Sequence, residues 1–265
     1  MRIKVINPNT TASMTRLIGE SARLVAGPGV EVEAVSPSMG PSSIESHYDE
    51  ALAVPGILAE VAAGEAEGVD GYVIACFGDP GLEAARELAT GPVVAIAEAA
   101  MRTATYLGRS FSVVTTLGRT RGRAWDLAHA YGVASACRGV HACEIPVLEL
   151  ETSPDARDRI TEACRHALAL DGSDVIVLGC AGMADLCAHV SEAVGAPVVD
   201  GVAAATVTVQ GLVTLGLRTS AVGELAPPLP KAYTGLLSGF TVADDPQPGA
   251  VQHAGGPGNG TRPTA

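Results

Sequence analysis

Aromatic side chains and positive charge are both scarce in this sequence. Aromatic residues make up 3% of the chain, so its core must be packed from aliphatic and small side chains. Lysine and arginine together number 17 against 29 aspartate and glutamate residues, which gives a formal net charge of -12. Such a charge opposes nonspecific association with nucleic acid or an anionic membrane surface. The composition therefore favours a globular protein whose partner is a small molecule, with no nucleic-acid and no membrane partner.

The sequence also lacks an apolar run of the kind that spans a membrane. Its longest weakly polar segment, Gly201–Leu217, is interrupted by Thr206 and Gln210 and falls short of the roughly 20 apolar residues that a bilayer requires. We interpret it as a helix that covers a sheet. The first residues, MRIKVINPNTT, enter a strand pattern without a charged leader or an apolar stretch, which predicts a cytoplasmic protein.

Zinc-binding and redox cysteine patterns are absent as well. The six cysteines, at positions 76, 137, 143, 164, 180 and 187, include no CxxC pair. Cys137, His141 and Cys143 form a C-x3-H-x-C cluster, but a fourth ligand at a suitable spacing is missing. We therefore expect no metal site, and we expect no disulfides if the compartment is reducing.

Short apolar runs alternate with longer amphipathic segments, which is typical of a parallel sheet with crossover helices. The predicted strands are Ile3–Ile6, Val30–Ser36, Tyr72–Ala75, Val93–Ile96, Phe111–Thr115, His141–Ile145, Val175–Leu178 and Val198–Val199. The predicted helices lie near residues 12–25, 48–66, 81–89, 97–106, 119–131, 154–170, 183–193 and 202–215. The fold class is therefore α/β. The segment 244–265 is rich in proline and glycine and predicts a disordered tail.

Two parts of the sequence are similar at a constant spacing. The stretch GVDGYVIACFGDPGL from Gly68 matches GSDVIVLGCAGMADL from Gly172, with Gly, Asp, Cys, Gly and Leu coinciding at an offset of 104 residues. Each copy carries one cysteine after one strand, which predicts two pseudo-twofold-related lobes, each a mainly parallel sheet flanked by helices. We expect the active site in the cleft between them, because ligands of such sheets bind beyond the carboxyl ends of the strands.

Cys76 and Cys180 each follow a predicted strand and precede a glycine and a helix. Unsatisfied N–H groups and the helix dipole stabilise a thiolate at a helix start, so we expect a lowered pKa at both cysteines. Two such groups on opposite walls of a cleft form a proton-transfer pair, in which one removes a proton from a carbon acid while the other protonates the opposite face. Two alternatives stay open, since a buried cysteine is often structural and a thiolate is also a nucleophile.

Five motifs together carry a family resemblance. They are INPNTT at Ile6–Thr11, ESHYDEALA at Glu45–Ala53, ACFGDPGL at Ala75–Leu82, VVTT at Val113–Thr116 and LGCAGM at Leu178–Met183. Through these motifs, in this order over roughly residues 1 to 240, the sequence resembles the hydantoin and allantoin racemase branch of the aspartate/glutamate racemase superfamily. The resemblance implies a first lobe of residues 1–100 completed by 203–243, a second lobe of residues 101–202, and a homo-oligomer.

The resemblance also implies which residues act. It makes Cys76 and Cys180 the two acid/base groups of a cofactor-independent mechanism. The implied substrate-binding residues are Asn7, Phe77, Gly78, Thr115, Thr116, Ala181 and Gly182. Amino-acid racemases follow their cysteines with polar residues, whereas this sequence has Phe-Gly and Ala-Gly. This difference indicates a neutral cyclic substrate such as a 5-substituted hydantoin, allantoin included, whose enolate oxygen is stabilised by backbone N–H groups.

Other activities and roles stay open at this point. The same fold serves arylmalonate decarboxylase and maleate isomerase, and a non-catalytic small-molecule binder is a further alternative. Asp79 and Pro80 are expected to cap and begin the helix that follows Cys76. Arg119, Arg121 and Arg123 are expected to form a solvated face rather than an anion site.

Overall fold

The computed structural model describes residues 1–242, which fall into two compact units. The first unit, Met1–Pro227, contains every named strand. The second unit begins at Pro228, and its described part holds the 3-10 helix η5 (Gly235–Phe240) and an antiparallel bridge between Lys231 and Val242. The predicted tail, 244–265, lies outside the described residues.

The first sheet has four parallel strands in the order β2-β1-β3-β4. Its strands are β1 (Arg2–Ile6), β2 (Glu31–Val35), β3 (Gly71–Ile74) and β4 (Val93–Ala95), and its crossover helices are α1 (Ala12–Val25), α2 (His47–Glu67) and α3 (Leu82–Leu88). All residues of β3 and β4 are buried, which is typical of a parallel sheet with helices on both faces. Because both faces of the sheet are covered, a ligand can reach it only at the ends of the strands.

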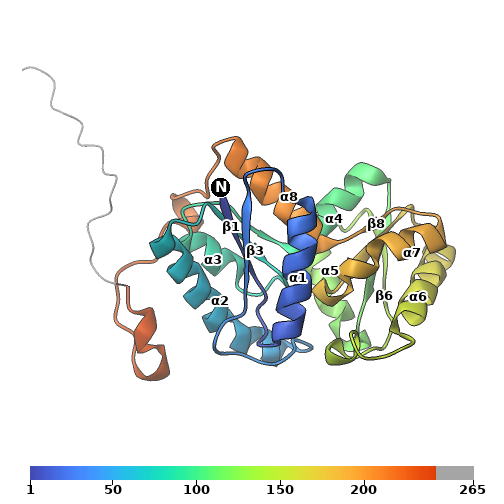
Figure 1. Cartoon of the computed structure of the whole chain (residues 1–265), viewed down its shortest axis with the longest axis horizontal. Helices are drawn as coiled ribbons and strands as arrows, with labels where there is room; N and C mark the ends of the chain where they lie inside the picture. The colour runs from blue at the N-terminus through green and yellow to red at the C-terminus, as the bar shows by residue number, and fades with distance from the viewer. Residues whose placement is uncertain (243–265) are drawn as a thin grey trace, which may run out of the picture. The chain divides into compact units, whose positions relative to one another are not determined.

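The second sheet repeats this topology with the order β6-β5-β7-β8. Its strands are β5 (Phe111–Thr115), β6 (Cys137–Ala142), β7 (Val175–Gly179) and β8 (Val198–Val199). The helices around it are η1 (Gly118–Thr120), α5 (Arg121–Ala130), η2 (Val147–Glu149), α6 (Ala156–Asp171), η3 (Ala181–Leu186) and α7 (Cys187–Val194). The predicted α/β fold of two lobes, each with a parallel sheet flanked by helices, is confirmed, and Figure 1 shows the two sets of elements side by side.

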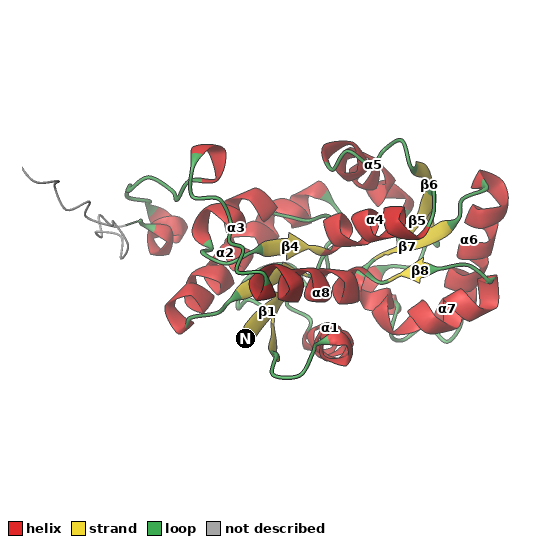
Figure 2. Ribbon diagram, turned by 90° about the horizontal axis from the view of Figure 1, so that it is seen from above, coloured by secondary structure: helices red, strands yellow, loops and turns green. Residues whose placement is uncertain are grey.

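Two helices connect the sheets. The chain leaves the first sheet through α4 (Ile96–Leu107) and returns through α8 (Gly201–Thr214), which packs against α4 and against β3 and β4. Figure 2 shows α4 and α8 running alongside each other between the two sheets. The predicted helix at 202–215 is thus confirmed as a cover for a sheet. The lobe limits at residues 100 and 203 stay a prediction, and the chain from Pro228 on belongs to a separate compact unit.

The strand predicted at His141–Ile145 is displaced toward the N-terminus and spans Cys137–Ala142. Its register with β5 pairs Val113 with Val140 and Thr115 with Ala142, so the edge of the sheet is reached there. Glu144 then adopts a left-handed backbone with φ 54, which a strand does not accommodate. The apolar residues Cys143 and Ile145 led the prediction to extend the strand beyond Ala142, where it ends.

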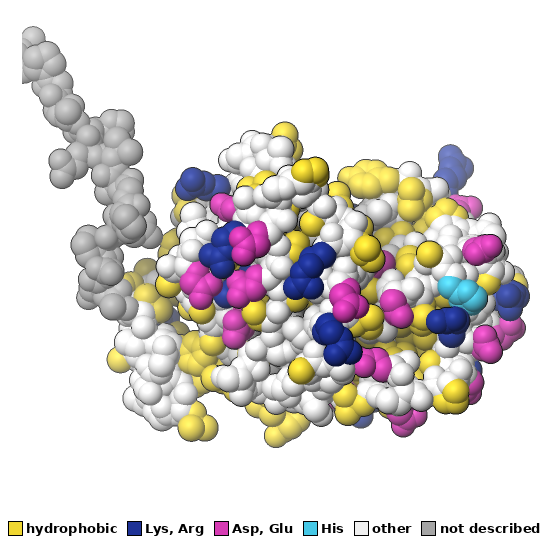
Figure 3. Space-filling view, viewed as in Figure 1, with side chains coloured by type: hydrophobic (Ala, Val, Ile, Leu, Met, Phe, Trp, Pro, Cys, Tyr) yellow, Lys and Arg dark blue, Asp and Glu magenta, His cyan; other side chains and the backbone are white. Residues whose placement is uncertain are grey.

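The core is built mainly from small and aliphatic side chains, as the low aromatic content predicts. Val5, Val73, Val113 and Val177 are fully buried and belong to one cluster that extends through both sheets. No helix among residues 1–242 is long and apolar enough to cross a membrane. Figure 3 shows acidic and basic side chains interspersed on one face rather than separated into a basic patch.

Candidate active site

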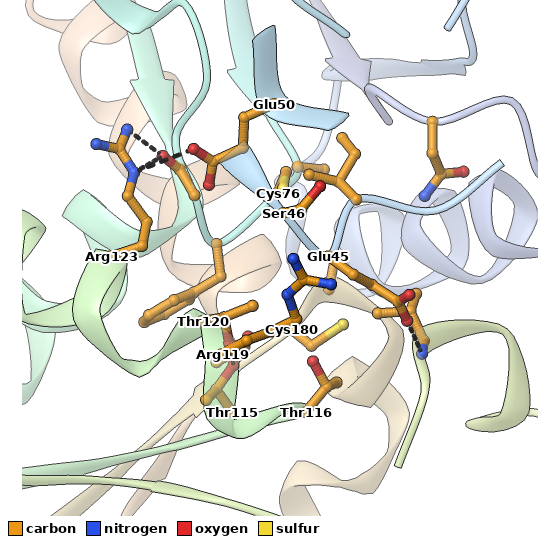
Figure 4. Close-up of a pocket in the computed structure, with 18 of the residues that line it drawn as sticks. Glu45, Ser46, Glu50, Cys76, Thr115, Thr116, Arg119, Thr120, Arg123 and Cys180 are labelled. Atoms are coloured by element: carbon orange, nitrogen blue, oxygen red, sulfur yellow. Dashed lines mark hydrogen bonds and ion pairs between the residues drawn. The ribbon is translucent and has the colours of Figure 1, made fainter. Parts of the chain in front are cut away.

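A cavity of about 190 Å³ opens at the carboxyl ends of β3, β5 and β7, between the two sheets of the first unit. It is smaller than the roughly 300 to 1,000 Å³ of typical ligand pockets, which favours a small ligand. Its lining residues are Asn9, Met14, Ile44, Glu45, Ser46, His47, Glu50, Ala75, Cys76, Phe77, Gly78, Thr115, Thr116, Arg119, Thr120, Arg123, Val147, Gly179, Cys180 and Ala181. Figure 4 shows Cys76 and Cys180 approaching this cavity from different strands.

The two cysteines occupy equivalent positions in the two lobes. Cys76 follows β3, and the chain turns at once, with the N–H of Asp79 donating to the Cys76 carbonyl at 3.0 Å. Cys180 follows β7, and the N–H of Met183 donates to its carbonyl at 3.2 Å. In each case the N–H of the second following residue, Gly78 or Gly182, donates to the thiol. The repeat in the sequence is therefore a repeat of one local structure.

Burial has the largest influence on both thiols. It raises the pKa of Cys76 well above its ordinary value and the pKa of Cys180 to about 12, while the N–H groups of Gly78 and Gly182 act in the opposite direction. The expectation of a lowered pKa is therefore wrong for the free protein. The physical reason is burial by the surrounding fold, which the helix starts do not offset: a turn separates Cys76 from the short α3, and Cys180 is followed by the 3-10 helix η3. Burial therefore favours the protonated form of both residues in the free protein.

Most of the residues predicted for the site line this cavity. Besides the two cysteines, they are Phe77, Gly78, Thr115, Thr116 and Ala181. Asn7 and Gly182 do not line it. The Asn7 amide donates to the side-chain oxygens of Asn9 and Thr15, both at 2.9 Å, and the cavity is reached by Asn9 instead. Gly182 takes part only through its N–H group at Cys180. Substrate contact by these nine residues stays a prediction.

The arginines are solvated as expected at positions 119 and 121, which are exposed, but two of the three also reach the cavity. Arg119 and Arg123 line the cavity, and only Arg121 lies outside it, where its Nε donates to the Val140 carbonyl. The Nε and Nη2 of Arg123 donate to the Gly78 carbonyl at 2.9 and 2.6 Å, and Nε lies 3.6 Å from Oε2 of Glu50. Residues 119 and 123 are four positions apart, so their side chains lie on the same face of the helical segment. This spacing could have indicated that both arginines face the cavity.

Arg119 is the more unusual of the two. Among residues 1–242 it has no hydrogen bond or ion pair, and Figure 4 shows its guanidinium extending between Cys76 and Cys180 in that view. The nearby carboxylates are already engaged, since Glu45 accepts from the N–H of Val147 at 2.7 Å and Glu50 contacts Arg123. The cleft therefore holds a cation that is available to a ligand.

The prediction that Asp79 caps the helix after Cys76 is also wrong. Its two carboxylate oxygens accept from the N–H groups of Ala97 and Glu98, at 3.0 and 2.9 Å, so Asp79 caps α4. The Tyr131 hydroxyl donates to the same carboxylate at 2.6 Å. The reason is the left-handed backbone of Asp79, with φ 46, which turns the side chain away from α3.

The C-x3-H-x-C cluster does not converge on one point. Nε2 of His141 lies 2.7 Å from Oδ2 of Asp171, and the Cys137 and Cys143 thiols donate to the carbonyls of Gly139 and Thr116. No group of three or more metal-ligating side chains occurs within residues 1–242.

Fold and cavity together define a class: a two-lobed α/β protein with a small cavity between paired parallel sheets, lined by one cysteine from each lobe. The particular family follows from comparison with known proteins. Residues 3–209 match the family model described as Asp/Glu/Hydantoin racemase. The chain belongs to this family of isomerases.

Three relatives illustrate the similarity. A hydantoin racemase of Rhizobium meliloti is 49% identical over 236 residues, covering 89% of this chain and 98% of that protein. The solved structure of an allantoin racemase from Klebsiella pneumoniae has a TM-score of 0.89 at 51% identity and covers 91% of this chain and 99% of that one. The allantoin racemase from Pseudomonas fluorescens has a TM-score of 0.86 at 42% identity, covering 89% and 100% of the two chains. An unliganded arylmalonate decarboxylase, at 18% identity and a TM-score of 0.55, shares the fold alone.

Proposed function

We propose that this protein racemises 5-substituted hydantoins by transferring the proton at C5 between Cys76 and Cys180. The observation that carries the proposal is the placement of these two cysteines at equivalent turns of opposite lobes, lining one small cavity. Neither cysteine alone would distinguish a base from a buried structural thiol. Two equivalent thiols on one cavity fit a reaction that must reach both faces of one carbon.

The proton balance of the reaction needs one thiolate and one thiol. The thiolate takes the C5 proton and the thiol on the other side donates its proton to the opposite face, so that the two cysteines exchange roles with each inversion. The C5–H bond is acidified by the neighbouring carbonyl, and the electron pair left behind is delocalised onto that carbonyl oxygen. The raised pKa of both thiols lowers the amount of thiolate, but it also makes each thiolate a stronger base toward a weak carbon acid.

The lining of the cavity supports a neutral ring as substrate. Phe77, Ala181 and Val147 give apolar contact, while Thr115 and Thr116 supply hydroxyl groups. The two acidic residues of the lining, Glu45 and Glu50, are held by other contacts. A hydantoin, which has two ring carbonyls and two ring N–H groups, can use such a mixed lining, and one of its carbonyl oxygens can accept from the guanidinium of Arg119. Allantoin is a 5-ureido-hydantoin and belongs to the same substrate class.

The test is C5 deuterium exchange together with loss of optical rotation. Each enantiomer of a 5-alkyl hydantoin and of allantoin is incubated with the protein in deuterated water, with an enzyme-free sample as control. We expect enzyme-dependent exchange and racemisation, loss of racemisation in Cys76→Ala and in Cys180→Ala, and retention of it in Cys187→Ala, which removes a thiol outside the cavity. Unchanged rotation and no exchange across the panel would refute the proposal. Consumption of an arylmalonate or of maleate would instead support one of the related activities.

We also infer that the protein is a cytoplasmic homo-oligomer. The support for assembly is a set of exposed apolar side chains at the ends of α4 and α8: Tyr106 is 86% exposed, Leu107 53% and Leu215 72%. Large apolar side chains left exposed to solvent can become buried when subunits assemble. Light scattering on the purified protein tests the assembly, and a monomeric mass would contradict it.

A further inference from the structure

We infer that Arg123 and Tyr131, at the two ends of α5 in the second lobe, are positioning residues that hold the Cys76 turn of the first lobe in its reactive geometry. The inference rests on the proposed function, because it assigns these residues a role in proton transfer by Cys76. Neither side chain needs to touch the substrate: each acts through the backbone or carboxylate of the turn, residues 76–79.

The turn is short and strained. The N–H of Asp79 donates to the Cys76 carbonyl and the N–H of Gly78 donates to the Cys76 thiol, so the sulfur is placed by the residues that follow it. Asp79 is a non-glycine residue in the left-handed region, with φ 46. A backbone of this kind costs about 1 kcal/mol or more and persists only when surrounding contacts hold it.

Both ends of the turn are held from α5. Arg123 donates two hydrogen bonds to the Gly78 carbonyl, at 2.9 and 2.6 Å, and is itself oriented by Glu50. The Tyr131 hydroxyl donates at 2.6 Å to the carboxylate of Asp79, which also accepts from the start of α4. An ideal Cβ on Gly78 would contact Oε1 of Glu50, so the backbone of the turn lies close to the Arg123–Glu50 ion pair. The guanidinium of Arg123 thus binds the backbone of the turn at Gly78, and the phenol of Tyr131 binds the side chain of Asp79.

The pseudo-symmetric turn at Cys180 has no such polar hold. In the first lobe, the positions equivalent to Arg123 and Tyr131 are Met14 and Ala22. Met14 and Arg123 each lie eight residues after the end of β1 or β5, and Ala22 and Tyr131 each lie sixteen residues after it. The Met14 Cε lies 3.7 Å from an ideal Cβ on Gly182, so α1 also reaches the cysteine turn of the other lobe. The contact is apolar, however, and within residues 1–242 no side chain of α1 hydrogen-bonds to residues 180–183. The two lobes therefore hold each other's turns by different means.

This asymmetry gives a selective test. In a Cys180→Ala background only Cys76 can remove the C5 proton, and in a Cys76→Ala background only Cys180 can. We expect Arg123→Gln and Tyr131→Phe to slow C5 deuterium exchange at least about tenfold in the first background and less than about twofold in the second. A merely structural role would lower both exchanges together. The matched controls are Arg138→Gln, an exposed arginine of β6, and Tyr106→Phe, an exposed tyrosine of α4, which should change neither.

A second measurement does not depend on any racemase activity. Amide hydrogen exchange followed by mass spectrometry should show faster deuterium uptake in the segment 75–81 of Arg123→Gln, with uptake in 179–184 unchanged, because the turn amides are protected only while the turn is held. If Arg123→Gln does not fold, the same measurements are made on Arg123→Lys and Tyr131→Phe. Arg123→Lys keeps the positive charge but loses the two hydrogen bonds to Gly78. Equal loss in both cysteine backgrounds, or unchanged uptake in 75–81, overturns the inference. Wild-type protein that exchanges no C5 proton refutes the proposed function, whereas the uptake result still decides whether α5 holds the turn.

Discussion

The buried carboxylate of Asp79 should make the stability of this protein decrease as the pH rises. Burial raises the pKa of Asp79 from 3.8 to about 7, against the opposing effect of its hydrogen bonds from Tyr131, Ala97 and Glu98. The folded protein therefore holds this proton more tightly than the unfolded chain does. The contribution of Asp79 is most favourable below about pH 4 and is lost as the pH rises through about 7.

The size of the effect follows from the difference between the two pKa values. A separation of about three pKa units corresponds to about 4 kcal/mol in the free energy of unfolding between pH 4 and pH 8. The negative charge of Glu98 adds to the cost of ionisation, and the hydroxyl of Tyr131 reduces it. Removal of that hydroxyl in Tyr131→Phe should therefore raise the pKa of Asp79 further and extend the loss of stability to higher pH.

Urea unfolding at a series of pH values measures this effect. Trp125, the single tryptophan, lies in α5 next to the network and serves as the fluorescence reporter. Asp79→Asn removes the titrating group, so its stability should fall between pH 4 and pH 8 by about 4 kcal/mol less than that of the wild type. Other acids with a raised pKa, such as Asp200 and Glu60, titrate in both proteins and cancel in the comparison. Parallel pH profiles for the two proteins would refute the reasoning.

Two further predictions concern the cleft. Gly78→Ala places a Cβ against Oε1 of Glu50, so the Glu50 carboxylate must move away from Arg123, and activity should fall by about threefold. Gly122→Ala in α5, where a Cβ meets nothing within 4 Å, should leave activity unchanged and stabilise the helix by up to about 1 kcal/mol. Turnover assays and thermal unfolding check both, and equal activities would contradict the argument. Arg119→Gln removes the cation that has no partner among the described residues. It should raise KM about tenfold for 5-ureido-hydantoin, whose substituent carries a carbonyl, but by less for a 5-alkyl hydantoin. Initial rates with both substrates measure the difference, and equal changes in KM would argue against contact between Arg119 and the substituent.

The sequence was sufficient to predict the local structures that repeat. The matching stretches around Cys76 and Cys180 predicted two lobes and a thiol at the end of a strand in each, and the parallel sheets confirm the lobes. This prediction succeeded because a cysteine that directly follows the end of a buried parallel strand must lie at the carboxyl edge of the sheet. Thr115 was located in the cavity for the same reason.

Contacts made across the molecule were not predictable in this way. Asp79 precedes a short helix in the sequence, and local capping rules assigned it there, but its carboxylate reaches α4 eighteen residues later and Tyr131 in the other lobe. Arg123 looked like part of a solvated helix face because its partners, Gly78 and Glu50, belong to the first lobe. The thiol pKa values depend on burial by the whole fold, so the motif around each cysteine could not supply their direction.

The unequal anchoring of the two cysteine turns has a thermodynamic consequence for a racemase. The enantiomers of a substrate have equal free energies in water, so the ratio kcat/KM must be the same in both directions, however differently Cys76 and Cys180 are held. The hydrogen bonds of Arg123 at one turn and the packing of Met14 at the other can therefore make kcat and KM differ between the two enantiomers, but only if both change by the same factor. Loosening the Cys76 turn would therefore change kcat/KM by the same factor for both enantiomers, and it would leave the final racemic mixture unchanged.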